Sequence, residues 1–414
     1  GMNGIYDVVV ALRWLQANLP AFGGDPGRVM LFGQSSGSYA VCTLCVSHAA
    51  RGLFWAAALQ SGPCLGGPPG RGWGPVTSIS PSEIAHEVMT SLNVSDVHGL
   101  RQIRDASRIQ WPARWMNDAA LAPYFSGYFV DPAVATQPPE ALWRAGALVP
   151  AALLLGATSK DGTAAFYGTA PTLGNVAPDP PQLGPAFYAL KLQTAWGPLA
   201  TQVAARYPLS RFNGSAQAAF VQADADAYVI CPQLQIARLA SAAGAKVWHY
   251  EFRHLLPSRV HPRGFGCDNG IELDIVLVPS PGAPASEWAT HSADVRFVFG
   301  THLGADSVQA AGGHNQTYCP FTPAESRLSD DMGAYWTALA GAGDPNGGGM
   351  AGGSASPAEY WPEYTAEGGR ASRVLRAGQG RGTPPPTAVE NRIHEEDCAF
   401  WEGLWLVASG QPRQ

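Results

Sequence analysis

A serine lies between two glycines in residues 33–37, which read Gly-Gln-Ser-Ser-Gly. The apolar residues 29–32 before this stretch predict a strand, and the small residues after it predict a helix, so Ser35 should lie on a sharp strand-to-helix turn. Gly33 and Gly37 suit such a turn because side chains there would collide with the neighbouring strand and helix. A serine hydroxyl is a poor nucleophile until a general base reaches it, and an exposed turn provides that access. The stretch therefore predicts a nucleophilic serine.

A nucleophilic serine of this kind works with a histidine base and with a carboxylate that orients the histidine. Residues 148–157 form a short apolar run of the kind that a fully buried strand shows, and Asp161 follows shortly after it. Open α/β sheets place their chemistry just past the carboxyl ends of their strands, so Asp161 is the predicted acid. A solvated turn aspartate before Gly162 explains the local sequence equally well, and this alternative stays open.

The chain offers ten histidines as candidates for the base. Six of them fall in or beside predicted helices and the predicted strand 246–252, which makes them poor candidates: His48, His86, His98, His249, His254 and His394. His291 has the best pattern, because a long loop precedes it and an aromatic-rich segment follows it. The remaining loop histidines, His261, His302 and His314, stay rivals. With His291 as base, the order serine, acid, histidine is that of the α/β-hydrolases.

The surrounding pattern predicts elements that hold these residues in place. Helices expected at 5–19 and 37–50 alternate with strands at 29–32 and 53–59, as in a parallel sheet wrapped in helices. We interpret residues 1–414 as one domain with a helical excursion at about 75–120. Further helices are expected within 180–239 and at 81–92, 326–339 and 391–408, with low-complexity loops at about 341–357 and 378–386.

Composition excludes several classes of protein. The 414 residues are 46% hydrophobic and carry a net charge of −6, so the chain has a large core and no basic footprint for nucleic acid. The longest apolar run, residues 145–157, is too short for a bilayer, which needs about 20 residues. We expect no membrane span. Three sequons would accept N-linked glycans in a secreted protein: Asn93, Asn213 and Asn315.

The seven cysteines make an odd count, so at least one thiol is unpaired or pairs between chains. Cys42 and Cys45 have the spacing of metal ligands, but they lie in the helix expected after the serine turn, and no second pair follows them. We therefore interpret them as two thiols of the core and expect no metal site.

Longer motifs extend the pattern over most of the chain. They are ALRWLQ at 11–16, AFGGDPGRV at 21–29, LFGQSSG at 31–37, QSG at 60–62, GATSKDG at 156–162, HSADVRFVFG at 291–300, GDPN at 343–346 and CAFW at 398–401. With these motifs the chain resembles the type-B carboxylesterase and cholinesterase family, nearly from end to end.

The resemblance implies an α/β-hydrolase fold that lacks its first strands, and hydrolysis of a small carboxylic ester through an acyl-enzyme. It implies Ser35 as the nucleophile, Asp161 as the acid and His291 as the base. It also implies a disulfide between Cys231 and Cys398. No metal or organic cofactor is needed for this chemistry.

The chain departs from the family pattern at several positions. Gln34 stands where the family usually has glutamate, which removes a charge near the pocket and favours neutral esters. Ser36 replaces the usual alanine, and its backbone N–H is the expected oxyanion donor. Asp161 replaces the more frequent glutamate, and Ser292 replaces glycine. The family's disulfide in the helical excursion has no evident counterpart.

The family's glycine-rich oxyanion loop lies upstream of Gly1, so residues 1–414 alone are expected to be inactive. The resemblance and the sequons suggest a secreted protein or one of the endoplasmic reticulum lumen. Two alternatives stay open. One is a non-catalytic adhesion or binding domain of the cholinesterase type, which the retained Ser35, Asp161 and His291 disfavour. The other is a lipase or sterol esterase.

Overall fold

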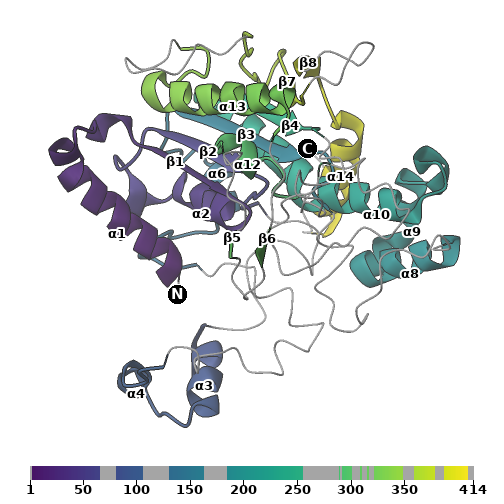
Figure 1. Cartoon of the computed structure of the whole chain (residues 1–414). Helices are drawn as coiled ribbons and strands as arrows, with labels where there is room; N and C mark the ends of the chain where they lie inside the picture. The colour runs from purple at the N-terminus through teal and green to yellow at the C-terminus, as the bar shows by residue number, and fades with distance from the viewer. Residues whose placement is uncertain are drawn as a thin grey trace.

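The computed structural model describes residues 2–65, 81–105, 130–162, 184–254, 289, 291–300, 308–309, 315–316, 321–347, 359–377 and 387–408. A six-stranded sheet in the order β1-β2-β3-β4-β7-β8 forms its centre (Figure 1). The strands are β1 (Met30–Gln34), β2 (Ala56–Gln60), β3 (Ala152–Thr158), β4 (Lys246–Phe252), β7 (Ala371–Leu375) and β8 (Thr387–Asn391). The first five are parallel and β8 is antiparallel to β7. A separate pair, β5 (Val308–Gln309) and β6 (Asn315–Gln316), is antiparallel.

Helices cover both faces of this sheet, which is why β2 and β3 are buried along their whole length. The helices are α1 (Asn3–Asn18), α2 (Ser36–Leu44), α3 (Pro81–Ser91), α4 (Val97–Arg101), α6 (Pro139–Arg144), α8 (Pro185–Trp196), α9 (Ala200–Arg206), α10 (Ala216–Ala225), α11 (Cys231–Ala242), α12 (Val295–Val298), α13 (Pro323–Ala342) and α14 (Glu395–Ala408). A π-helical turn, η9 (Asp226–Ile230), joins α10 to α11. Two apolar cores result, one containing α2 and α11, the other α12 and α13.

Local chemistry sets the ends of the long helix α13. Thr322 accepts a hydrogen bond from the Glu325 N–H at 3.3 Å, and the Glu325 carboxylate accepts one from the Thr322 N–H at 2.7 Å. Pro323 occupies the first helical position, where its missing N–H costs nothing. The helix ends at Ala342, and Gly343 follows with a left-handed φ of 66° that suits glycine.

The predicted elements agree with most of these bounds. The strand expected at 246–252 is β4, and the helix expected at 81–92 is α3. The helix expected at 37–50 is too long, because α2 ends at Leu44 and a 3₁₀ turn follows at His48–Ala50. In the excursion, α3 and α4 are helical and residues 106–120 lie outside the described part, as do 348–357 and 378–386.

The C-terminal part differs most from the sequence-based prediction. Strands β7 and β8 were not expected, and β8 ends at Asn391, the first residue of the tail helix that the sequence predicts. Helix α14 begins only at Glu395, because Arg392 and His394 have φ values of 55° and 56°. Left-handed residues cannot continue a right-handed helix.

The cysteines also differ from the prediction. Cys42 is not a free thiol, because it forms a disulfide with Cys64. Cys45 is a free, buried thiol, and burial raises its pKa well above the usual range. A second disulfide joins Cys231 to Cys398, the pair that the resemblance implied, and ties α14 to α11.

Candidate active site

Ser35 lies on the turn between β1 and α2, at the carboxyl edge of the parallel sheet. Its φ of 55° and ψ of −121° are unusual for a residue other than glycine. A Cβ at Gly33 would lie 2.5 Å from the carbonyl carbon of Gly37, so glycine is required at position 33. The expected collision at Gly37 does not occur with any described atom within 4 Å. Ser35 therefore lies on a strained turn, with the backbone of Gly33 packed against that of Gly37.

The structure brings the three predicted residues together. Ser35 Oγ lies 2.9 Å from Nε2 of His291, and Nδ1 of the same ring bonds to Oδ1 of Asp161. The carboxylate is fully buried, whereas 13% of the imidazole side chain is exposed. If Nδ1 carries the proton, Nε2 has its lone pair directed at the serine hydroxyl. This arrangement has the geometry of a nucleophile, its base and the orienting acid.

Three donors fix the other oxygen of Asp161. Oδ2 accepts hydrogen bonds from Ser61 Oγ at 2.6 Å, from the Thr158 N–H at 2.9 Å and from Thr158 Oγ1 at 3.0 Å. All three donors come from the ends of β2 and β3, neighbouring strands of the sheet. The aspartate is thus oriented by rigid elements, and only Oδ1 is directed at His291.

The electrostatics of His291 favour a base. Burial alone lowers its pKa, but the charge and hydrogen bond of Asp161, with a smaller effect of Asp294, outweigh burial and raise the pKa. Gln34 places its amide nitrogen 3.3 Å from His291 Nε2 and brings no charge. The position before the nucleophile therefore contacts the base directly.

Asp294 is a second buried acid near the same histidine, three residues after it in the chain. Tyr250 donates to its Oδ2 at 2.6 Å and Gln60 at 3.1 Å. Burial raises the pKa of Asp294, which the two hydrogen bonds oppose. Gly156 makes room for the Tyr250 ring, since a Cβ there would lie 2.2 Å from it. Tyr250 and Gln60 thus hold the Asp294 carboxyl in place near the base.

Comparison with known proteins decides the family. A model described as the Carboxylesterase family matches residues 1–401. The chain belongs to the carboxylesterase family. Carboxylesterase 4A of Bos taurus is 27% identical over 437 residues, which cover 98% of this chain and 66% of that protein. Acetylcholinesterase of Bungarus fasciatus is 26% identical over 428 residues, 97% of this chain and 59% of that protein.

Solved structures agree with the expected fold. A PNB esterase matches with a TM-score of 0.63 and 22% identity, covering 96% of this chain and 68% of that one, so the fold is that of an α/β-hydrolase. The chain spans 57% to 66% of the length of its curated carboxylesterase and cholinesterase relatives. Among the described strands, β1 has a neighbour on one side only, β2.

Other histidines of the described residues also pair with acids, and none of these has Ser35 as a partner. His254 contacts Glu325 at 2.9 Å, and His394 contacts Asp226 at 2.9 Å. His249 is buried, which lowers its pKa to about 4, and it contacts the Ser372 hydroxyl. The rivals His261, His302 and His314 lie outside the described residues.

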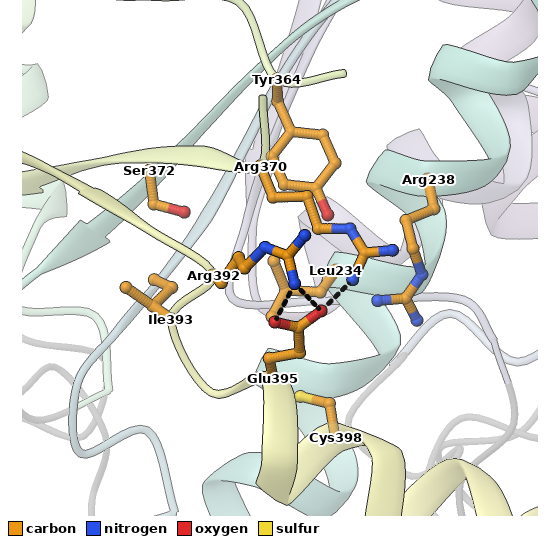
Figure 2. Close-up of a pocket in the computed structure, with 9 residues that line it drawn as sticks. All are labelled: Leu234, Arg238, Tyr364, Arg370, Ser372, Arg392, Ile393, Glu395 and Cys398. Carbon is orange, nitrogen blue, oxygen red and sulfur yellow. Dashed lines mark hydrogen bonds and ion pairs between the residues drawn. The ribbon is translucent and has the colours of Figure 1, made fainter. Parts of the chain in front are cut away.

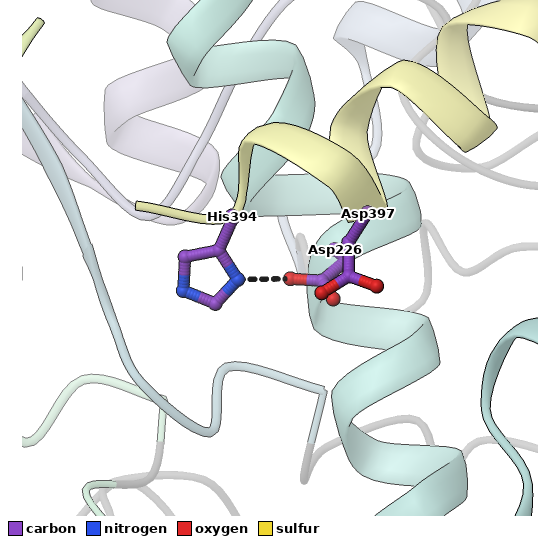
Figure 3. Close-up of side chains that lie close together, drawn as sticks. All are labelled: Asp226, His394 and Asp397. Atoms are coloured by element: carbon purple, nitrogen blue, oxygen red, sulfur yellow. Dashed lines mark ion pairs between the residues drawn. The ribbon is translucent and has the colours of Figure 1, made fainter. Parts of the chain in front are cut away.

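Asp226, His394 and Asp397 form a cluster with the spacing of metal ligands (Figure 3). Protein groups already occupy its oxygens. Arg211 binds both oxygens of Asp397 at 2.8 and 2.7 Å, and Tyr207 donates to Asp226 at 2.9 Å. The cluster is therefore an ion-pair network between η9 and the start of α14.

A pocket beside Cys398 contains three arginines (Figure 2). Arg370 and Arg392 both pair with Glu395, and Arg238 pairs with Glu402. The guanidinium groups thus have carboxylate partners. Ser35, Asp161 and His291 are not among the residues that line this pocket. These ion pairs connect α14 to α11 and to the residue before β7.

Sequence reasoning assigned no role to Ser61, Thr158 or Asp294. All three lie inside motifs that carry the family resemblance, and this was the signal that could have drawn attention to them. Ser61 and Asp294 contact residues of other strands or loops, so local pattern could not reveal their roles. Thr158 contacts Asp161 only three residues away, within one motif. Ser36 begins α2, where the first N–H groups of a helix have no partner within the helix.

Proposed function

We propose that this carboxylesterase hydrolyses small carboxylic esters through an acyl-enzyme on Ser35. The observation that carries the proposal is the 2.9 Å contact between Ser35 Oγ and His291 Nε2 on a strained turn, with Asp161 on the other ring nitrogen. A non-catalytic adhesion domain has no need for this geometry. Family membership supports a small-molecule ester as substrate.

The first half-reaction forms the acyl-enzyme. His291 Nε2 takes the proton from Ser35 Oγ while Oγ attacks the ester carbonyl carbon. Asp161 holds the Nδ1–H tautomer and stabilises the imidazolium that forms. The oxyanion of the tetrahedral intermediate accepts a hydrogen bond from the Ser36 N–H. The imidazolium then protonates the departing alkoxide, and the ester C–O bond breaks.

The second half-reaction repeats these steps with water. His291 takes a proton from the water as its oxygen attacks the acyl carbon, and the proton returns to Ser35 Oγ when the acid product leaves. No metal or redox partner enters either half. The neutral amide of Gln34 near the base favours neutral esters over cationic ones.

We infer that the protein matures in an oxidising compartment, either the endoplasmic reticulum lumen or outside the cell. The two disulfides among the described residues support this, since disulfides persist there and are rare in the cytosol. Asn93 and Asn213 lie on exposed turns and are proposed glycan acceptors; the side chain of Asn315 lies outside the described part. No helix in the described ranges is long and apolar enough to cross a membrane.

Hydrolysis of a p-nitrophenyl ester tests the proposal. We expect the intact protein to hydrolyse this ester, and His291→Ala and Asp161→Ala to lower kcat by about three to six powers of ten. An intact protein without turnover would contradict ester hydrolysis itself.

A further inference from the structure

Residues 61–64, which we call the bridge segment, follow β2 and connect the two sides of the candidate site. Ser61 donates its hydroxyl hydrogen bond to Asp161, and its N–H donates to the Gly156 carbonyl at 2.8 Å. Its φ of 53° lies in the left-handed region. A non-glycine residue stays in this conformation only when its surroundings hold it there. The contact with Asp161 thus depends on what fixes the segment.

Gly62, the next residue of the bridge segment, packs against the backbone of the turn that carries Ser35. A Cβ at Gly62 would lie 2.1 Å from the carbonyl oxygen of Ser35, so the two backbones are in direct contact. The Gly62 carbonyl accepts a hydrogen bond from Ser38 Oγ at 2.9 Å. Ser38 belongs to α2, the helix that begins at the nucleophile. The bridge segment therefore touches both the serine turn and the acid.

The far end of the bridge segment is bonded covalently to the same helix. Cys64 forms the disulfide with Cys42, and its N–H donates to Cys42 Sγ at 3.0 Å. Trp143 donates its indole N–H to Cys64 Sγ at 3.2 Å. Ser38 and Cys42 are four residues apart on α2, so they project from one face of the helix. Two bonds from this face hold the segment at successive points.

We propose that the Cys42–Cys64 disulfide is a positioning element of the active site. It fixes the bridge segment against α2 so that Ser61 keeps Asp161 in line with His291, while the same helix carries Ser35. The disulfide therefore sets the distance between nucleophile and acid rather than only adding stability. This inference rests on the proposed ester hydrolysis.

The second disulfide provides a matched control. Cys231–Cys398 spans 167 residues, against 22 for Cys42–Cys64, so the loop-closure model gives it the larger effect on stability. It joins α11 to α14, whereas Cys42–Cys64 joins α2 to the bridge segment. Removing it should lower stability without changing the alignment of the acid.

The test is a double-mutant cycle in the intact protein. The variants are Cys42→Ala/Cys64→Ala, Ser61→Ala, and the two combined, each compared with Cys231→Ala/Cys398→Ala. Kinetics on a p-nitrophenyl ester are measured together with the low-field proton resonance of the His291 Nδ1–H, which reports its bond to Asp161 without turnover.

We expect Ser61→Ala to lower kcat about tenfold, the effect of one hydrogen bond to a charged group when Thr158 still supplies two others. Loss of Cys42–Cys64 should lower kcat similarly, leave KM within about twofold, and shift the low-field resonance. In the Ser61→Ala background, removing the Cys42–Cys64 disulfide should lower kcat by less than about twofold, because the disulfide acts through Ser61. Any effect of Cys231→Ala/Cys398→Ala on kcat should add to that of Ser61→Ala, and the low-field resonance should not shift in this control variant.

Two results would overturn the proposal: a kcat unchanged without the disulfide, or full additivity of its loss with Ser61→Ala. If Cys42→Ala/Cys64→Ala does not fold, Ser38→Ala removes the other bond from α2 and enters the same cycle with the same criteria. Failure of ester hydrolysis is seen separately, as an intact protein without turnover that still shows the His291 resonance.

Discussion

Replacing Gln34 by glutamate puts a negative charge beside the base. The amide nitrogen of Gln34 lies 3.3 Å from His291 Nε2, and glutamate has nearly the same size. Two opposite unit charges at this separation attract by about 1 kcal/mol in bulk water and about 5 kcal/mol at an effective dielectric constant near 20. At 1.36 kcal/mol for each pKa unit, these energies correspond to pKa shifts of about 1 and about 3.7 units. Because Gln34 is partly exposed, we expect the pKa of His291 to rise by about 1 to 2 units.

The assay is the pH dependence of kcat/KM for a neutral ester, whose acid limb reports protonation of the free base. In Gln34→Glu this limb should move to higher pH by about 1 to 2 units, because the pKa of His291 rises and more protons must be removed to free the base. Gln34→Met is the control, since it has similar length and no charge, and its limb should stay in place. The variant should also gain preference for a cationic ester over a neutral isostere. An active Gln34→Glu with an acid limb within about 0.3 units of the parent would refute the placement of Gln34 beside the base.

Three further predictions concern backbone contact, pH and covalent structure. Gly62→Ala should lower activity at least about tenfold and lower Tm, because its Cβ would lie 2.1 Å from the carbonyl oxygen of Ser35. Gly403→Ala is the control, because no described atom lies within 4 Å of its Cβ, and it should change neither activity nor Tm. Kinetics and thermal melts measure the two effects. Burial lowers the pKa of His394, but the charges of Asp226 and Glu251 outweigh burial and raise the pKa to about 10. The stability that His394 contributes should therefore be complete below about pH 6.5 and lost as pH rises through 10, by about 5 kcal/mol. His394→Gln should flatten that alkaline loss in urea unfolding, and an unchanged slope would contradict the assignment. Peptide mapping without reductant should recover Cys231 joined to Cys398. Replacing both cysteines by alanine should lower the free energy of unfolding by up to about 4 to 5 kcal/mol. Alkylation of these two cysteines in the native protein would contradict the bond.

The sequence predicted those parts of the fold that local pattern determines. The alternation of residues 246–252 gives β4 with both ends correct, and the glycines around Ser35 predict its turn. The apolar run before Asp161 predicts β3, so the acid is found at a strand end. Each of these signals comes from burial or backbone geometry within one element.

Other features depend on partners distant in the chain, and local pattern misses them. The local sequence does not distinguish Cys42 from Cys45 as a disulfide partner. Only the path of the chain after Gly62 brings Cys64 to Cys42. Strand β8 pairs with β7 across a segment of low complexity, so its strand character comes from the neighbour. Ser61 was part of a recognised motif, but its role appears only once β2 lies beside β3.

The central claim is that Ser35 is the activated nucleophile, and labelling by a fluorophosphonate tests it most directly. Only a serine with a base in reach attacks such a phosphorus centre at a useful rate. The intact protein should carry one label, mapped to Ser35 by peptide sequencing, and Ser35→Ala should carry none. His291→Ala and Asp161→Ala should label far more slowly, in line with losses of about three to six powers of ten in kcat. Labelling that persists in Ser35→Ala, or that maps to Ser36, would contradict the account.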